Sequence, residues 1–462
     1  MKETTKTMEP IEQTVDNAYT IGNILKFLVP SLIGILLFIV PISTGDGMTI
    51  PVAYFAEQIN AYFGKFIPAI TAILMGLSTL GTIVAVFMKP RFILENRYLN
   101  TLLNVGYFWL IVRLIGTVFA IVTIFQVGSS MIFSEDTGGL LMYDLIPILF
   151  SMFLLAGFLL PLLLNFGLLE FFGALLLKIM RPLFKLPGRS SLDCLASWVG
   201  DATIGVLLTA RQYEEGYYTK REAAVISTTF SVVSITFTIV VLSYLDLEPY
   251  FLSYYTTIVI AGLVAAFIMP RIPPLSKKAD TGYENVELKS EVEIPAGTSS
   301  VKWGLNQAVE KAKKSSGVRA ILKEGTQNVL DMWLGVLPIV MAIGTIALVI
   351  AEFTSFFTIV GKPFEPILAW MQVPEAAEAA QTMVVGFADM LMPAVFGSGV
   401  ESEMTRFIIA CVSVTQLVYL SEMGGLILGS KLPISLLDLI WIFLLRTCIT
   451  LPIVVGMAHI IF

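Results

Sequence analysis

The amino-acid sequence predicts an all-α polytopic membrane protein with about nine transmembrane helices, arranged as two inverted repeats that each hold an amphipathic helix and a re-entrant hairpin. Only 14% of the 462 residues are charged and 56% are hydrophobic, whereas soluble domains carry roughly 25% charged residues. Most of the chain must therefore face something other than water. This composition excludes soluble enzymes, nucleic-acid-binding proteins and disordered scaffolds.

The apolar segments predict how often the chain crosses the bilayer, because about 20 apolar residues span the hydrocarbon core as a helix. A polar tail, 1–23, precedes the first span, and 24–144 forms a three-helix scaffold. Nine segments have the required length and composition: 24–42, 66–88, 107–127, 145–169, 223–245, 250–270, 332–351, 407–428 and 436–460.

The distribution of Lys and Arg predicts the orientation, since cytoplasmic loops carry an excess of these residues. With a cytoplasmic N-terminus, 24 of the 29 Lys and Arg fall on the inside and three on the outside. The sequence therefore predicts a multi-pass protein of the inner cell membrane whose C-terminus lies outside.

Residues 145–270 form the first predicted repeat. After its first span, 168–187 places its charges on one side of a helix, which is typical of an amphipathic helix lying on a membrane surface. Residues 190–212 are apolar but interrupted by Gly200-Asp201-Ala202, and each apolar flank is too short to cross. A re-entrant hairpin followed by two uninterrupted spans is the simplest interpretation.

Residues 331–462 repeat this plan, with an amphipathic segment at 353–372 and a second interrupted apolar stretch at 376–400. Each unit crosses the bilayer three times, so the second copy must be inverted relative to the first. Inverted repeats with broken helices that meet near the bilayer midplane characterise many secondary transporters.

The cytoplasmic linker 271–330 separates the two repeats and carries 17 charged residues. We expect it to be extended up to about residue 300, with an interfacial helix between Trp303 and Asn328 as one alternative. The simpler interpretation is a solvated tether that joins the two halves.

The first hairpin and the helix after it resemble a known family. Residues 200–205 (Gly-Asp-Ala-Thr-Ile-Gly), followed by the Ser- and Thr-rich stretch 227–237, resemble the Gly-Asn-Ala-Ala-Thr-Pro hairpin of the nucleoside-recognition "Gate" domain. The order of elements over 145–462 is similar to the core of concentrative nucleoside transporters, and the whole chain is similar to the YjiH group of Gate-domain inner-membrane proteins. Those transporters carry a Gln-Thr-Glu cluster in the first hairpin, whereas this chain has Asp201 and Thr203, so the resemblance leaves the solute open.

Polar residues at predicted membrane depth are the candidates for a site, because they are costly in lipid. Asp201, Asp389 and Glu422 are expected to couple transport to an ion. The predicted substrate-binding residues are Asp201, Thr203, Ser231, Ser234, Asp389, Ser398, Thr415, Gln416 and Glu422.

Structural roles remain as alternatives for these residues. An Asp at a hairpin tip also caps a half-helix, and Ser or Thr in a span often bonds its own helix or a neighbouring one. Glu422 could pair with Arg446 instead of binding an ion, and Ser398 could lie in a plain surface turn.

The sequence thus predicts a secondary active transporter, not an enzyme, that moves a small polar solute with H⁺ or Na⁺ and needs no metal or cofactor. Its partners are the lipid bilayer, the solute and the coupling ion, and a homo-oligomer stays open. The alternative is a non-transporting membrane gate or assembly factor like the spore-maturation relatives of the Gate family. An intramembrane aspartyl protease is disfavoured because Trp198 occupies a position where such enzymes need Gly.

Overall fold

The computed structural model describes residues 20–40, 42–44, 47–197, 202–230, 238, 241–242, 244–284, 286–289, 298–315 and 317–462. These residues are almost entirely helical, which confirms an all-α polytopic membrane protein. Most of the predicted span 223–245 after residue 230 lies outside the described residues. Among the residues that are described, eight helical segments are long and apolar enough to cross a membrane: Ile21–Phe38, Ile67–Met88, Tyr107–Phe125, Ser130–Leu164, Phe251–Lys277, Ile321–Phe353, Glu403–Gly429 and Leu436–Ile461.

The N-terminal scaffold is helical apart from one small sheet that the sequence did not predict. Strands β1 (Ile42–Thr44) and β2 (Gly47–Thr49) pair antiparallel, with Ile42 opposite Thr49. The scaffold helices are α2 (Ile21–Phe38), α3 (Pro51–Phe63), α4 (Ile67–Ile83) with its π-helical end η1 (Val84–Met88), α5 (Arg91–Leu94), α6 (Arg97–Leu103), α7 (Tyr107–Phe125) and α8 (Ser130–Phe133).

The first predicted repeat begins with a long interrupted helix. Its elements are η2 (Glu135–Leu145), α9 (Ile146–Leu159), α10 (Pro161–Leu164), the amphipathic helix α11 (Leu168–Phe184), the short helix α12 (Ser190–Leu195), α13 (Ala202–Glu214), α14 (Lys220–Thr229), η4 (Glu248–Tyr250) and α16 (Phe251–Ile268). Helix α14 begins at a capping box between Thr219 and Glu222, which fixes where the helix starts after the hairpin.

The described parts of the linker pack against the first repeat, so the prediction of a solvated tether is wrong for them. Short turns η5 (Met269–Arg271) and η6 (Leu275–Lys277) lead into a segment in which Thr281 accepts a hydrogen bond from the Lys220 N–H at 2.8 Å. Helix α17 (Ser300–Lys313) lies against α11 and α2, and α18 (Val318–Leu330) lies against α9. Burial of Ala308, Val309 and Ala312 in the α2–α17 contact explains this docking, since buried apolar area drives association.

The second predicted repeat follows directly from α18. Its elements are η7 (Asp331–Val336), α19 (Leu337–Phe353), α20 (Phe356–Gly361), α21 (Phe364–Trp370), α22 (Ala376–Val385), α23 (Met392–Gly397), α24 (Glu403–Gln416), η8 (Leu420–Gly424), α25 (Gly425–Gly429) and α26 (Leu436–Ile461). The predicted span 407–428 is confirmed as a candidate membrane-crossing segment, Glu403–Gly429, but its helix is interrupted between Gln416 and Leu420, which the sequence did not predict.

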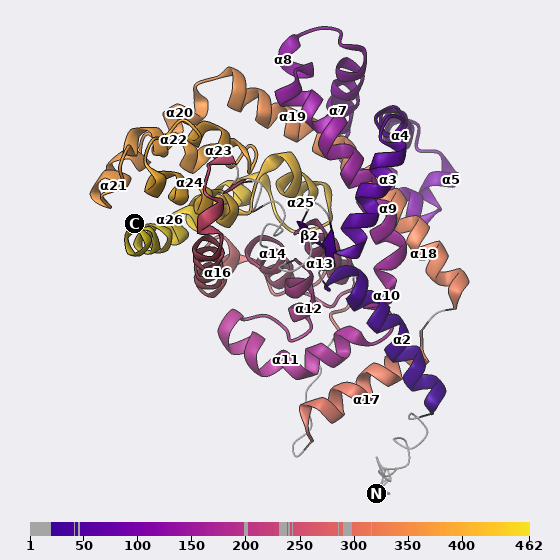
Figure 1. Cartoon of the computed structure of the whole chain (residues 1–462). Helices are drawn as coiled ribbons and strands as arrows, with labels where there is room; N and C mark the ends of the chain where they lie inside the picture. Colours follow the sequence, from indigo (N-terminus) through magenta and orange to yellow (C-terminus); the bar gives the residue numbers. More distant parts are fainter. Residues whose placement is uncertain are drawn as a thin grey trace, which may run out of the picture.

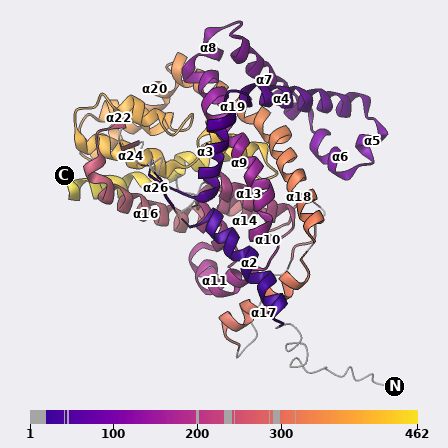
Figure 2. The ribbon, with the colours of Figure 1, turned by 45° about the vertical axis from the view of Figure 1, so that its right-hand side comes forward.

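The scaffold helices contact both predicted repeats. Helix α3 packs on α9, and α7 packs along α19, where a side chain at Gly116 would overlap the backbone at Pro338. In Figures 1 and 2, α11 and α17 lie at the lower end of the molecule and α20 and α22 lie at the upper left. Helices α12–α14 lie between these two ends.

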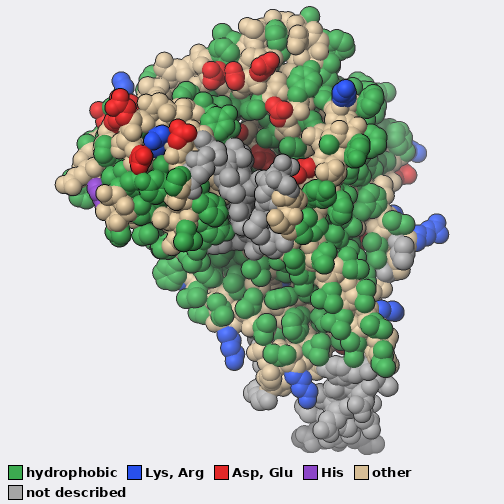
Figure 3. All heavy atoms as spheres, in the orientation of Figure 1, with side chains coloured by type: hydrophobic (Ala, Val, Ile, Leu, Met, Phe, Trp, Pro, Cys, Tyr) green, Lys and Arg blue, Asp and Glu red, His purple; other side chains and the backbone are tan. Residues whose placement is uncertain are grey.

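The surface is mostly apolar, as lipid contact requires. Figure 3 shows one face covered largely by hydrophobic side chains. Among the described side chains in its lower third, Lys and Arg are visible without Asp or Glu. The end that carries α11 and α17 is thus the basic end of this face.

Candidate functional site

The tip of the second hairpin lies against the break in the neighbouring helix. Helices α22 and α23 pack on each other and are joined by the tip, residues 386–391. Across from the tip, α24 ends at Gln416, and Leu417 takes a left-handed conformation with φ of 62°. The Leu420 N–H donates to the Phe387 carbonyl at 2.8 Å, and the Ser421 N–H donates to the Ala388 carbonyl at 3.0 Å. The tip therefore satisfies backbone groups that the break releases, which unwound backbone requires at membrane depth.

Asp389 is buried in this tip, with 7% of its surface exposed. Its carboxylate accepts hydrogen bonds from the Leu391 N–H at 2.8 Å and from the Ser421 hydroxyl at 2.7 Å. No Lys or Arg of the described chain forms an ion pair with it. Buried carboxylates are normally paired with a cation, so the surroundings of Asp389 suit a proton or a small cation.

Gln416 presents a buried acceptor to the same tip. Its Nε2 donates to the Met383 carbonyl at 2.7 Å and to the Thr447 hydroxyl at 2.9 Å. Its Oε1 has no hydrogen-bond partner in the described structure, and a side chain at Gly386 would overlap it. A buried acceptor without a partner costs about 1–3 kcal/mol, so a bound donor or cation would be stabilised there.

Arg446 joins the ends of two helices from different halves of the chain. It lies on α26 with 1% of its surface exposed. Its Nε and Nη2 donate to the Thr415 carbonyl at 3.0 and 2.9 Å, and its Nη1 donates to the carbonyls of Thr229 at 3.0 Å and Thr228 at 3.3 Å. Each helix C-terminus carries roughly half a negative charge, so the ends of α14 and α24 together balance about one positive charge. Arg446 therefore binds backbone carbonyls, and the predicted pairing with Glu422 is not found in the described structure.

The predicted site residues divide into three groups. Asp389, Thr415 and Gln416 come together around the break, where the Thr415 hydroxyl donates to the Cys411 carbonyl at 2.9 Å, and Glu422 is half-buried just beyond it in η8. Thr203 is buried in the first turn of α13, whereas Ser398 is exposed and donates to the Val395 carbonyl at 2.8 Å. Asp201, Ser231 and Ser234 lie outside the described residues.

The first hairpin contains a buried carboxylate that the sequence analysis missed. Asp193 of α12 is fully buried and accepts hydrogen bonds from Gln212 Nε2 at 2.6 Å, Tyr218 Oη at 3.0 Å and Thr209 Oγ1 at 3.1 Å. The signal was available, because Asp193 is a carboxylate within the apolar stretch 190–212. Only the fold brings Asp193 into contact with α13 and with the turn before α14.

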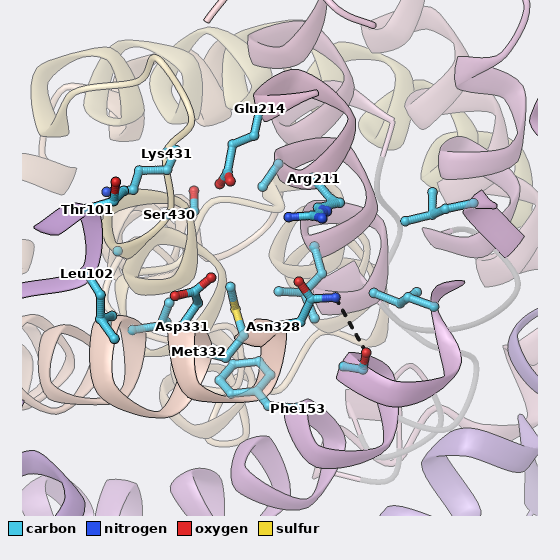
Figure 4. Close-up of a pocket in the computed structure, with 18 of the residues that line it drawn as sticks. Thr101, Leu102, Phe153, Arg211, Glu214, Asn328, Asp331, Met332, Ser430 and Lys431 are labelled. Carbon is cyan, nitrogen blue, oxygen red and sulfur yellow. Dashed lines mark hydrogen bonds between the residues drawn. The ribbon is translucent and has the colours of Figure 1, made fainter. Parts of the chain in front are cut away.

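A charged cavity of about 100 Å³ lies between the end of α13, the α18–η7 helix and the loop after α25. Figure 4 shows the carboxylates of Glu214 and Asp331 extending toward the same space, with Arg211 and Lys431 at its edges. Burial raises the pKa of Glu214 to about 7, against the opposing effect of Arg211. Since a water molecule needs roughly 10–15 Å³ of such space, this cavity has room for several waters or a small polar group.

The described residues contain no group of three or more His, Cys, Asp or Glu side chains that could hold a metal ion.

Comparison with known proteins agrees with this architecture. A family model described as nucleoside recognition, the Gate domain, matches residues 145–248, which run from the end of η2 to the start of η4. An uncharacterized protein of Alkalihalophilus pseudofirmus is 51% identical over 447 residues, covering 97% of this chain and 96% of that protein. These matches confirm the Gate-domain resemblance.

Proposed function

We propose that this chain, which belongs to the same family as the uncharacterized Alkalihalophilus pseudofirmus protein and contains a nucleoside-recognition Gate domain over residues 145–248, is a secondary active transporter. It moves a small polar solute, a nucleoside or another small metabolite, across the inner membrane. The movement is coupled to H⁺ or Na⁺. The Gate match supports a nucleoside as the first solute to test.

One observation carries this proposal: the break in α24, the C-terminal end of α14 and a hairpin tip meet around Arg446 and Asp389. Broken helices expose backbone carbonyls and amides that bind solutes and ions in secondary transporters. The break after Gln416 and the end of α14 at Thr229 supply such backbone. A purely structural helix bundle gains nothing from a buried carboxylate without a cation, or from a buried amide oxygen without a hydrogen-bond donor, at this position.

The arrangement of elements supports two inverted repeats, the first from 145 and the second from 331. Each runs through a long helix, amphipathic segments, two short packed helices, a helix that ends or breaks early, and a final long helix. The amphipathic segments α11 and α20–α21 lie toward opposite ends of the molecule (Figure 1), as inversion requires. The basic end near α11 then faces the cytoplasm by the positive-inside rule.

Coupling is assigned first to the carboxylate that lies at the break in α24. Asp389 binds the proton or Na⁺, with the Gln416 Oε1 as a neighbouring oxygen ligand, and Asp201 and Glu422 are the further candidates. We assign the aqueous access from the cytoplasmic end to the cavity between Glu214 and Asp331, because Ser430 and Lys431, which follow α25, line it.

Uptake into proteoliposomes tests the proposal. A thermal-shift screen of nucleosides, amino acids, small peptides and organic acids first identifies ligands, because stabilisation grows with ligand concentration relative to Kd. Labelled ligand is then offered under an imposed H⁺ gradient and, separately, an imposed Na⁺ gradient. Accumulation that collapses when one gradient is removed identifies the coupling ion.

Matched variants separate the site from the fold. Asp389→Asn should abolish gradient-driven accumulation and leave the protein folded, because Asn keeps the size and the contact with Ser421. Glu378→Gln is the control, since this exposed acid lies on the same hairpin. If the Asp389→Asn variant accumulates the solute to the wild-type level, Asp389 does not couple transport to the ion. A folded protein that accumulates none of the ligands it binds would favour the non-transporting gate.

A further inference from the structure

A second cavity, of about 130 Å³, lies where α11, the base of the first hairpin and the linker meet. It is distinct from the site at the helix breaks, because none of its lining residues belongs to the second repeat. The residues that matter for its chemistry are Glu170, Arg181, Arg189, Tyr217, Glu222 and Lys289.

Three cations surround one aromatic ring at this cavity. The Arg189 Cζ lies 3.4 Å from the centre of the Tyr217 ring, and the Lys289 Nζ lies 3.7 Å from it. Lys311 of α17 donates to the Tyr217 hydroxyl at 3.0 Å. Burial raises the pKa of Tyr217, but the hydrogen bond from Lys311 and the charges of Arg189 and Lys311 outweigh burial and lower it. The local potential is therefore positive.

The carboxylates nearby do not neutralise this cluster. Glu222 forms an ion pair with Arg181, in which Nη1 lies 2.8 Å from Oε1. Glu170 lies 3.8 Å from the Arg189 Nη2, which is beyond hydrogen-bond distance. Lys289 and Lys311 form no ion pair with a carboxylate of the described chain. The cations of this cluster outnumber its carboxylates even when Glu215, whose charge also acts on Lys311, is included, so the cluster attracts an anion such as a phosphate group.

The ion pair between Arg189 and Glu170 leaves hydrogen-bonding groups unsatisfied. The Arg189 Nη2 and the Glu170 Oε2 are both buried and have no hydrogen-bond partner in the described structure, although Nη2 lies 3.8 Å from the Glu170 Oε1. Guanidinium groups prefer phosphate and carboxylate oxygens, which they bind with paired N–H donors. An anion in the cavity would supply the oxygen that Nη2 lacks.

The same residues connect the cavity to the interior of the first hairpin. The Arg189 Nε donates to the Gln212 Oε1 at 2.7 Å, and Gln212 in turn donates to the buried Asp193. On the linker side, the Lys289 N–H donates to the Gly216 carbonyl at 2.9 Å. An anion held by Arg189 and Lys289 would therefore fasten the linker to the hairpin base.

We propose that this cavity binds the phosphate group of an anionic phospholipid or of a soluble phosphorylated metabolite, and that the bound phosphate holds the linker and α17 against the first hairpin. The exposed apolar side chains of Leu175, Ile179 and Leu183 on α11 place the cavity beside a lipid-compatible surface. The site does not depend on the transport proposal, because binding is measured without a solute.

Two double variants with the same change in charge test the site in the full-length protein. Lys289→Gln with Lys311→Gln removes two cations from the cavity. Lys302→Gln with Lys313→Gln removes two exposed cations from α17, away from the cavity. Inorganic phosphate is titrated at constant ionic strength in neutral detergent, and the thermal unfolding midpoint is recorded. Native mass spectrometry counts retained phosphatidylglycerol against phosphatidylcholine.

The wild type and the Lys302/Lys313 variant should bind alike, and the Lys289/Lys311 variant should bind at least tenfold more weakly. Stabilisation by inorganic phosphate assigns a soluble source, and selective retention of phosphatidylglycerol assigns a lipid source. Equal binding by all three proteins, or binding of neither probe by the wild type, would overturn the proposal. Slower hydrogen exchange at the Lys289 amide on binding would report that the linker is fastened.

Discussion

Replacing Arg446 with Gln tests whether this residue holds the two halves of the protein together. The substitution removes four hydrogen bonds that the guanidinium donates to the carbonyls of Thr228, Thr229 and Thr415. Gln leaves no buried charge behind, so the cost comes from the three buried carbonyls that lose charged donors, at about 1–3 kcal/mol each, and the Gln amide can still satisfy part of them. We therefore expect the free energy of unfolding to fall by about 3–5 kcal/mol.

Reversible unfolding with SDS in mixed micelles measures this change, followed by the near-UV signal of the aromatic residues. Arg406→Gln is the matched control, because its 3.5 Å pair with Asp246 involves a carboxylate that is 85% exposed. Exposed pairs contribute at most about 1 kcal/mol. The stability loss of Arg446→Lys should lie between those of Arg446→Gln and Arg406→Gln, because an ammonium keeps the charge but lacks the planar guanidinium that reaches both helix ends. Equal losses for Arg446→Gln and Arg406→Gln would refute the role of Arg446 as the junction of α14 and α24.

Three further substitutions test neighbouring features by thermal or SDS unfolding. Gly386→Ala should destabilise the protein by about 1–3 kcal/mol because the new methyl group overlaps the Gln416 Oε1; Gly456→Ala, which meets no atom within 4 Å, should be neutral. Asp193→Ala should cost about 3 kcal/mol or more, since it leaves three buried donors without their acceptor, and a loss below 1 kcal/mol would contradict that network. The raised pKa of Glu214 means that the folded protein holds this proton more tightly than the unfolded chain, so stability is full below about pH 4.5 and falls as pH rises to about 7. Glu214→Gln should remove this fall, which amounts to at most ~3 kcal/mol, and an unchanged pH profile would show that Glu214 ionises freely.

The membrane class and most helix positions could be predicted from the sequence. A long apolar segment must form a helix to cross the lipid, because an unpaired backbone N–H or C=O group is too costly there. The start and end of α2, α7 and α26 therefore lie within a few residues of their predicted spans. The amphipathic helix α11 was also predictable, since its charge pattern has the helical period.

The candidate site was predicted only in part. Asp389 and Gln416 stood out as polar residues in apolar surroundings, and the structure places both at the break in α24. The break itself escaped prediction, because 407–428 contains no Pro and reads as one apolar helix. Its backbone is unwound because the hairpin tip supplies hydrogen bonds at Phe387 and Ala388, and that tip belongs to a different part of the chain.

The partners of Arg446 show the same limit. From the sequence, the natural partner of a buried cation is the nearest acid, Glu422. In the structure the guanidinium instead binds the carbonyls at the ends of α14 and α24, and Thr228 of α14 lies 218 residues before Arg446 in the chain. Backbone carbonyls have no signature in a sequence, since every residue carries one.

The sequence alone determined that this protein is a multi-pass helical membrane protein, because scarcity of charge and length of apolar segments are local properties, and its residues 200–205 and 227–237 pointed to the Gate domain that matches residues 145–248. The tertiary structure decided where α24 breaks and which carbonyls Arg446 binds. It also decided that the described parts of the linker pack against the first hairpin and α11 instead of remaining solvated. Each of these depends on hydrogen bonds and apolar contacts between segments far apart in the chain. Such contacts become favourable only when the fold brings both partners together.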